Sequence, residues 1–171
     1  MNLRDRLQPA LLDRLTDLAP QSQVEAEDSR VMNKSQIRDA VLRDLSWLLN
    51  SVQPLGTEGT PYPHVVDSVL NYGLPAMSGQ MASRVDVGQL ERTLKQAILR
   101  FEPRVMEDSL EVKALDASSV LDTHNVIEFE IRGFMWAQPV PLELLLRTQV
   151  DLEAGQVEVR DMTATTLRRR P

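Results

Sequence analysis

Apolar residues first recur at helical spacing near the start of the chain. The leucines between residues 9 and 18 follow one another at offsets of three and four, and Pro9 is acceptable in a first helical turn. This stripe consists of Leu11, Leu12, Leu15 and Leu18. Residues 19–34 are polar and show no sustained period, which is typical of a linker. We therefore expect residues 1–34 to form a short helical arm and a flexible linker.

Residues 35–50 carry the pattern of a helix that packs on a core. Its apolar stripe consists of Ile37, Val41, Leu45 and Leu48, flanked by Leu42 and Leu49. Ser35 is a suitable N-cap, and Asn50 is a suitable end. The following Pro- and Gly-rich residues predict a loop, and residues 64–75 predict a short helix that is ended by Asn71, Gly73 and Pro75.

A second long helix is expected over residues 86–101. Asp86 can cap its start, and apolar residues recur at positions 90, 94, 98 and 101. Pro103 stops it, because proline disfavours helical geometry in the residue before it. Glu102 is therefore expected at the exit of this helix.

Beyond residue 104 the spacing of apolar positions changes to two, which predicts strands with one wet face. The alternating sets are Leu110, Val112 and Ala114; Ile127, Phe129 and Ile131; and Leu142, Leu144 and Leu146. The Gly-containing segment DLEAGQ leads into Val157 and Val159, so the last two strands should form a hairpin. Helices followed by strands indicate an α+β fold, with N-terminal helices packed on a small antiparallel or mixed C-terminal sheet.

Aromatic residues make up only 4% of the chain, so the core must come mainly from Leu, Val and Ile. The few large rings become the expected anchors of the core, with an interface as the alternative. These rings are Trp47, Phe101, Phe129, Phe134 and Trp136.

Composition and charge narrow the class of protein. The chain has no cysteine, which removes disulfides, zinc-thiolate sites and thiol nucleophiles. A net charge of −6 argues against binding to a nucleic acid backbone, which needs a positive surface, and protein partners fit better. The first 15 residues carry charges inside their apolar run, and no later stretch approaches a membrane span. We expect a cytoplasmic protein without direct membrane insertion.

Ordinary enzyme signatures are missing from the sequence, so we expect no catalytic, metal-binding or cofactor-binding residues and no cofactor. His64 and His124 show no ligand spacing, and neither a nucleophile elbow nor a Gly-rich phosphate loop occurs. Met77, Met81 and Met106 are expected to fill gaps in the core, with a contact surface as the alternative.

One carboxylate has a distinctive setting, namely Glu102 in the segment FEPR, two residues from Arg104. A general acid must hold its proton, whereas a guanidinium beside a carboxyl group favours the ionised form. A buried ion pair or a polar contact to a partner is therefore favoured over an active-site acid.

The expected C-terminal hairpin would leave a row of unpaired backbone N–H and C=O groups at the edge of the sheet. Such an edge is a template for a strand of another chain, which suggests assembly by strand addition. Protection of the edge by charge or by the tail with Arg168, Arg169 and Arg170 is an equally weighted alternative.

Three segments together resemble the TssE family of type VI secretion baseplate subunits, relatives of the phage baseplate wedge proteins called lysozyme-like. They are VLRDLSWLLN at residues 41–50, SVLNYGLP at residues 68–75 and ILRFEPRV at residues 98–105. The resemblance spans residues 11–162. It implies an α+β wedge domain over residues 35–162, similar to the interlocking domain of contractile sheath subunits. The residues at the end of the chain, 163–171, predict a disordered tail.

The resemblance also implies a structural role in the cytoplasm at the inner face of the cell envelope, where the subunit joins the baseplate wedge to the first sheath ring. The implied partners are TssF and TssG of the wedge, TssK, and the sheath subunits TssB and TssC. The Glu-Pro-Arg motif of the family matches Glu102, Pro103 and Arg104, which are assigned to a polar contact with a partner. Two alternatives remain: a peptidoglycan-cleaving muramidase, and the equivalent subunit of a phage or other contractile machine.

Overall fold

The computed structural model describes residues 9–17, 20–21, 32–55, 61–77, 85–115, 126–137 and 140–163. Its helical elements are α1 (Leu11–Leu15), α2 (Lys34–Asn50), α3 (Pro63–Val66), η3 (Val69–Asn71), α4 (Val87–Phe101) and η5 (Glu107–Ser109). Its strands are β1 (Glu111–Leu115), β2 (Val126–Met135), β3 (Leu142–Asp151) and β4 (Gln156–Asp161). Most of the predicted linker, Met81, His124 and the tail from residue 164 onward lie outside the described residues.

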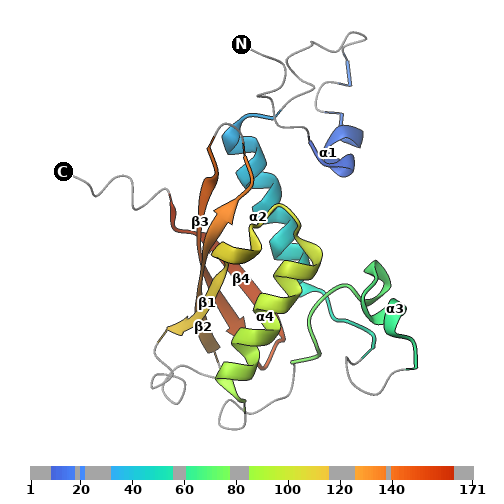
Figure 1. Ribbon diagram of the computed structural model, residues 1–171, viewed down its shortest axis with the longest axis vertical. Helices are drawn as coiled ribbons and strands as arrows, with labels where there is room; N and C mark the ends of the chain where they lie inside the picture. The colour runs from blue at the N-terminus through green and yellow to red at the C-terminus, as the bar shows by residue number, and fades with distance from the viewer. Residues whose placement is uncertain are drawn as a thin grey trace, which may run out of the picture.

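The four strands form one antiparallel sheet in the order β1-β2-β3-β4. The two long helices α2 and α4 lie along one face of this sheet, and α3 projects to the side (Figure 1). The predicted α+β class is therefore confirmed, and the sheet is antiparallel throughout its described strands. No helix in the described part of the chain is long and apolar enough to span a bilayer.

Helix α2 begins with a capping box. The Asn33 side chain accepts the Gln36 N–H at 2.9 Å, and the Gln36 side chain accepts the Asn33 N–H at 2.8 Å. The prediction of Ser35 as the N-cap is therefore wrong, because the Asn33 and Gln36 pair satisfies two free amides at once. The predicted apolar stripe is buried and the helix ends at Asn50 as expected.

Helix α4 follows the sequence expectation closely. The Asp86 carboxylate accepts the Gln89 N–H at 3.1 Å, and the helix ends at Phe101, directly before Glu102. Its buried side chains are Leu90, Leu94, Ala97 and Ile98. They fill the space between α4 and the sheet, where Phe129 is fully buried.

The predicted hairpin joins β3 and β4. The Asp151 carboxylate accepts the backbone N–H of Glu153 at 2.8 Å and of Ala154 at 3.0 Å, which closes the turn. Gly155 has a φ of 67°, in the left-handed region that glycine enters at little cost. Val157 is buried at the start of β4, which confirms the direction of its side chain.

The segment after α2 differs from the single short helix expected for residues 64–75. It forms α3 and η3, and Asn71 is buried, where its side chain accepts the Leu55 N–H at 3.0 Å. Residues 51–53 then pair with Leu74 in an isolated parallel bridge. Gly73, with a φ of 120°, allows this approach, because a Cβ there would lie 2.3 Å from the Ser51 carbonyl oxygen.

The aromatic anchors are the largest error of the sequence analysis. Phe129 is fully buried, but the exposed fractions of Trp47, Phe134 and Trp136 are 51%, 47% and 55%. Phe101 is half-buried and packs edge-to-face on Tyr72. Branched aliphatic residues around Phe129 fill the core instead, so most of the large rings remain at the surface.

Helix α1 is also shorter than the expected residues 9–18, and its leucines are exposed rather than packed on the body. Of the methionines placed in the core, Met77 is buried whereas Met106 is 39% exposed.

Candidate functional site

The Glu-Pro-Arg motif forms the turn between α4 and the sheet. The Glu102 N–H donates to the Ile98 carbonyl at 2.8 Å, and the Val105 N–H donates back to the Glu102 carbonyl at 3.1 Å. Val105 then pairs with Met135 of β2 in an isolated bridge. Pro103 thus stands where the chain leaves the helix and turns onto the sheet.

Glu102 and Arg104 are paired within this turn. The Glu102 carboxylate is only 3% exposed and accepts three hydrogen bonds from Arg104: from the backbone N–H at 3.1 Å, from Nε at 2.7 Å and from Nη2 at 2.6 Å. The structure therefore contains the Glu102–Arg104 ion pair, which the sequence analysis gave as one of two alternatives. Such charge-assisted, two-pronged contacts fix both side chains in one geometry.

The Arg104 guanidinium also reaches across to α2. Its Nη2 donates to the Asp44 carboxylate, and the Arg104 carbonyl accepts the Trp136 N–H at 2.7 Å. Burial alone would lower the pKa of Arg104, but hydrogen bonds and charges from Glu102 and Asp44 raise it above its ordinary value. Arg104 therefore ties α4, α2 and the end of β2 together as a permanent cation.

The network continues along α2 toward the N-terminal helix. Asp44 accepts hydrogen bonds from Arg43, at 2.9 Å from Nε and 2.8 Å from Nη2, and Arg43 donates to Asp13 of α1. The Arg43 guanidinium also lies 5.1 Å from the ring centre of the exposed Trp47. Five charged residues thus alternate in sign from the turn to α1: Glu102, Arg104, Asp44, Arg43 and Asp13.

Tyr72 closes one side of this cluster. Its hydroxyl donates to the Asp44 carbonyl at 3.3 Å, and its ring meets Phe101 edge-to-face with centroids 5.2 Å apart. Burial, followed by the negative charges of Asp44 and Glu102, raises the pKa of the Tyr72 hydroxyl.

Sequence reasoning found Glu102 and Arg104 but missed Asp44, Arg43 and Asp13. The one available signal was the Arg-Asp pair on the flank of an amphipathic helix, which is too common to single out. Contact of Glu102, Pro103 and Arg104 with a partner stays a prediction. Because Glu102 is buried, the 28% exposed side chain of Arg104 is the more accessible member of the ion pair.

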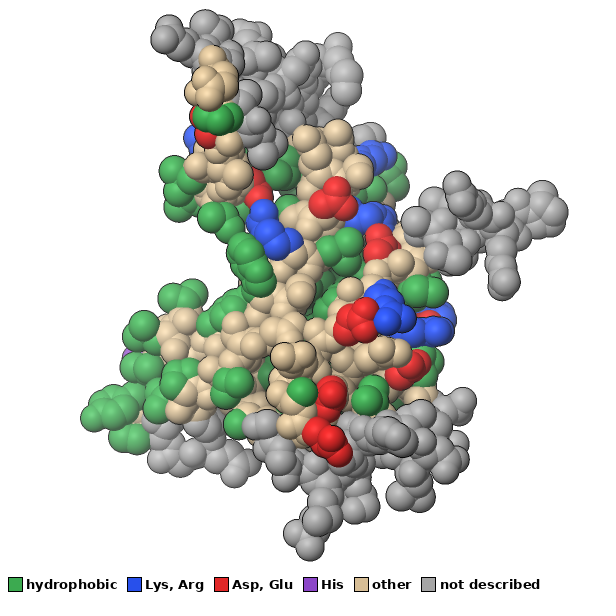
Figure 2. All heavy atoms as spheres, turned by 180° about the vertical axis from the view of Figure 1, so that it is seen from behind, with side chains coloured by type: hydrophobic (Ala, Val, Ile, Leu, Met, Phe, Trp, Pro, Cys, Tyr) green, Lys and Arg blue, Asp and Glu red, His purple; other side chains and the backbone are tan. Residues whose placement is uncertain are grey.

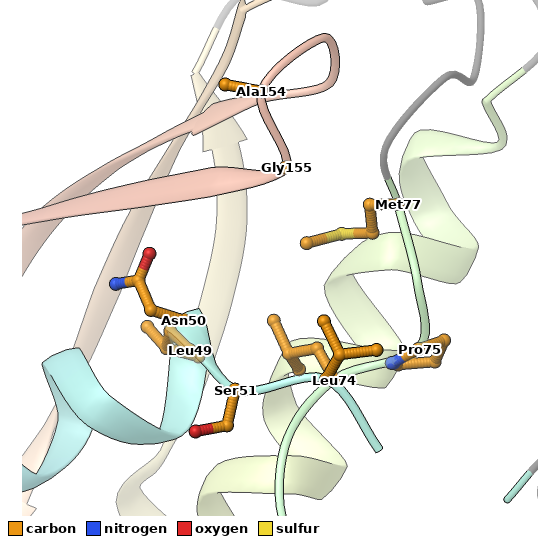
Figure 3. A pocket seen from close by; sticks show the side chains of 9 residues that line it. Leu49, Asn50, Ser51, Leu74, Pro75, Met77, Ala154 and Gly155 are labelled. Atoms are coloured by element: carbon orange, nitrogen blue, oxygen red, sulfur yellow. The ribbon is translucent and has the colours of Figure 1, made fainter. Parts of the chain in front are cut away.

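The described residues offer little for metal or pocket chemistry. No cluster of three or more possible metal ligands occurs among them, and His64 lies exposed on α3. A pocket of about 90 Å³ lies between the end of α2, residues 74–77 and the β3–β4 turn (Figure 3). Leu49, Leu74 and Met77 line it together with backbone and amide groups, and no acidic or basic side chain does.

Both edges of the sheet are covered at one point by a helix side chain. The Asn50 amide donates to the Val157 carbonyl at 2.8 Å and accepts the Val157 N–H at 2.9 Å, so it occupies the place of a neighbouring strand on β4. On β1 the Glu91 carboxylate accepts the Ala114 N–H at 2.7 Å. Along a strand, the backbone N–H and C=O groups of every second residue point to the same edge. The backbone groups of Val112 therefore face outward like those of Ala114, and those of Val159 face outward like those of Val157. Neither residue's outward-facing groups have a partner among the described residues.

Comparison with known proteins relates this chain to a protein family. A family model described as baseplate wedge protein gp25 matches residues 35–140, well over half of the chain. No curated protein matches significantly, and no solved structure does. The matched range includes α2, the segment around Gly73, α4, the Glu-Pro-Arg turn and the first two strands.

This family includes the TssE proteins, so the resemblance stated from the sequence is confirmed at the level of the family. It supports a structural role in a baseplate. The chain belongs to the baseplate wedge protein gp25 family.

Proposed function

We propose that this chain is the baseplate subunit of a type VI secretion system that joins the wedge to the first ring of the contractile sheath, without enzymatic activity. The observation that carries this proposal, beside family membership, is the pair of incompletely covered sheet edges. At each edge one helix side chain replaces a strand at one residue, and the next outward-facing residue stays unpaired among the described residues. A strand from a sheath subunit can extend the sheet there.

The expected partners are TssF and TssG of the wedge, TssK, and the sheath subunits TssB and TssC. Tagged protein purified from its native cells should recover the wedge and sheath proteins together. Recovery of neither group would refute the assignment to this machine. Recovery of phage-type tail proteins would assign the same structural role to another contractile machine.

Two proline variants test the strand-addition step. In Val159→Pro the lost N–H points away from β3, so the fold should survive while an added strand loses a hydrogen bond. In Glu158→Pro the lost N–H belongs to the β3–β4 ladder, so the hairpin itself should be destabilised. Unchanged sheath recovery with folded Val159→Pro would exclude strand addition at the β4 edge.

The Glu-Pro-Arg turn gives the second test of the proposal. Arg104→Ala should weaken recovery of baseplate partners, but the variant also leaves the Glu102 carboxylate buried without its cation. Thermal unfolding must therefore show a folded variant before the recovery is interpreted. Retained association by folded Arg104→Ala and Glu102→Ala variants would remove these residues from the interface.

The muramidase alternative makes a different demand on the same residues. Cleavage of a glycosidic bond needs two carboxyl groups beside a substrate cleft, one of them protonated. Glu102 is instead enclosed by Arg104, whose guanidinium donates hydrogen bonds to both of its carboxylate oxygens. Turnover of purified peptidoglycan, abolished by one carboxylate substitution, would establish the alternative.

A further inference from the structure

Helix α1 turns a polar side chain toward α2 and its leucines toward solvent. The Asp13 side chain is only 6% exposed and accepts a hydrogen bond from Arg43 of α2. Leu11 and Leu15 lie about one helical turn apart, and their exposed fractions are 72% and 74%. Figure 2 accordingly shows hydrophobic side chains at the surface of this part of the molecule. A helix that packs permanently on a domain does the reverse and turns its apolar side inward.

The helix is also too short to be stable without packing. It spans Leu11–Leu15, and backbone hydrogen bonds of 3.0 and 3.1 Å close its turns. Isolated helices of fewer than about 12–15 residues are marginal in water, so contacts with the rest of the chain must hold this one. It lies beside α2 and away from the sheet (Figure 1). Among the described residues, the ion pair of Asp13 and Arg43 joins the two helices.

Separation of this ion pair costs little on either side. Arg43 keeps two hydrogen bonds to Asp44, at 2.9 Å from Nε and 2.8 Å from Nη2, and its contact with the Trp47 ring. Asp13 gains, because its Oδ2 is buried and accepts no hydrogen bond from the described residues. Water can satisfy that oxygen once the helix leaves. The docked and released positions of α1 are therefore close in free energy.

The row of charges that ends at Asp13 also remains intact without it. With α1 docked, the row holds three carboxylates and two guanidinium groups, those of Glu102, Asp44 and Asp13 and those of Arg104 and Arg43. Without Asp13 it holds two of each, so the charges balance. Every contact of Arg104 with Glu102 and Asp44 is kept. Release of the helix therefore leaves the Glu-Pro-Arg turn undisturbed.

We propose that α1 is a releasable arm, which alternates between a docked position on α2, held by Asp13 and Arg43, and a released, unfolded form. Both forms are populated in the free subunit. Higher ionic strength favours the released form, because the Arg43 side chain is 32% exposed and salt screens its attraction to Asp13. Release frees Nη1 of Arg43 beside the exposed Trp47, so the arm controls access to this side of α2.

A chain without cysteine allows labels to be placed at two chosen sites. In the full-length protein, Leu15→Cys on α1 and Gln96→Cys on α4, both at exposed positions, carry spin labels. Pulsed electron paramagnetic resonance then measures the distance between the two labels. The expected result is a narrow docked component and a broad released component, with the docked share falling as salt is added. A single narrow distance that salt does not change would overturn the proposal, and so would a single broad distribution at low salt.

Substitutions in the ion pair supply the second test. Arg43→Met should lower the ratio of docked to released forms by about twofold or more, as expected for a partly exposed ion pair. Once Asp13→Ala has removed the carboxylate, Arg43→Met should change the ratio no further. Arg100→Met is the matched control, because Arg100 is 34% exposed and pairs with Asp67 at the end of α3. An unchanged ratio in Arg43→Met, or an equal fall in Arg100→Met, would overturn the role of Arg43.

Discussion

Removal of the Arg104 side chain should destabilise the fold through the carboxylate that it leaves behind. Arg104→Met keeps most of the aliphatic volume but removes two side-chain hydrogen bonds to Glu102 and the contact to Asp44. Glu102 is 3% exposed, so water cannot fully replace the lost cation. Breaking a buried pair costs about 3–5 kcal/mol, and partial exposure of Arg104 places the expected loss near the lower end, at about 3 kcal/mol. For a chain of this size this lowers the unfolding midpoint by roughly 6–12 °C.

The molecule contains its own matched control for this prediction. Arg160 contacts Glu158 through two hydrogen bonds of 2.8 Å, again two residues apart, but both side chains are more than half exposed. Arg160→Met should leave the midpoint near that of the unaltered chain, because exposed pairs contribute little. Thermal unfolding followed by circular dichroism measures both.

The same assay can isolate the buried charge. Glu102→Gln combined with Arg104→Met removes both charges, so the double variant should unfold at a higher temperature than Arg104→Met alone. Equal midpoints for Arg104→Met and Arg160→Met would refute the argument that burial of the carboxylate sets the cost.

Three further predictions concern positions outside the motif. Gly73→Ala should destabilise by more than about 1 kcal/mol, because a Cβ collides with backbone at a φ of 120°, whereas Gly88→Ala in α4 should be neutral or stabilising by denaturant unfolding. Asn50→Ala should cost about 1–3 kcal/mol in the same assay by leaving both Val157 backbone groups unpaired, and Asn50→Asp, which keeps the acceptor, should cost less. The raised pKa of Tyr72 means that the unfolded chain loses this proton before the folded chain does, so stability should fall as pH rises above about 10, and Tyr72→Phe should weaken that pH dependence.

The sequence predicted the elements whose periodicity is set by one buried face. Helices α2 and α4 have continuous apolar stripes, and β2 and β3 alternate between the core and the opposite face of the sheet along their full length. The end of α4 was predictable because Pro103 acts locally on the residue before it. These features depend on neighbours only a few residues apart.

The charge network could not be predicted in the same way. Arg104 meets Asp44 across 60 residues of sequence, and only the packing of α4 on α2 brings them together. The wrong prediction for the aromatic rings has a different origin. Trp47 and Phe134 lie on a helix and a strand whose buried faces were assigned correctly, so strict use of the period would have placed both side chains outside the core. The size of a side chain was a poorer guide to its burial than its position in the periodic pattern.

The place of Asn50 on β4 has a consequence for the alignment of any added strand. Its side chain presents one donor and one acceptor, as a peptide group does, and both are engaged at Val157. An incoming strand therefore finds the first outward-facing position occupied and must begin its hydrogen bonds at Val159. The amide therefore limits how far along β4 an added strand can pair, and the shared ladder is confined to the side of Val159.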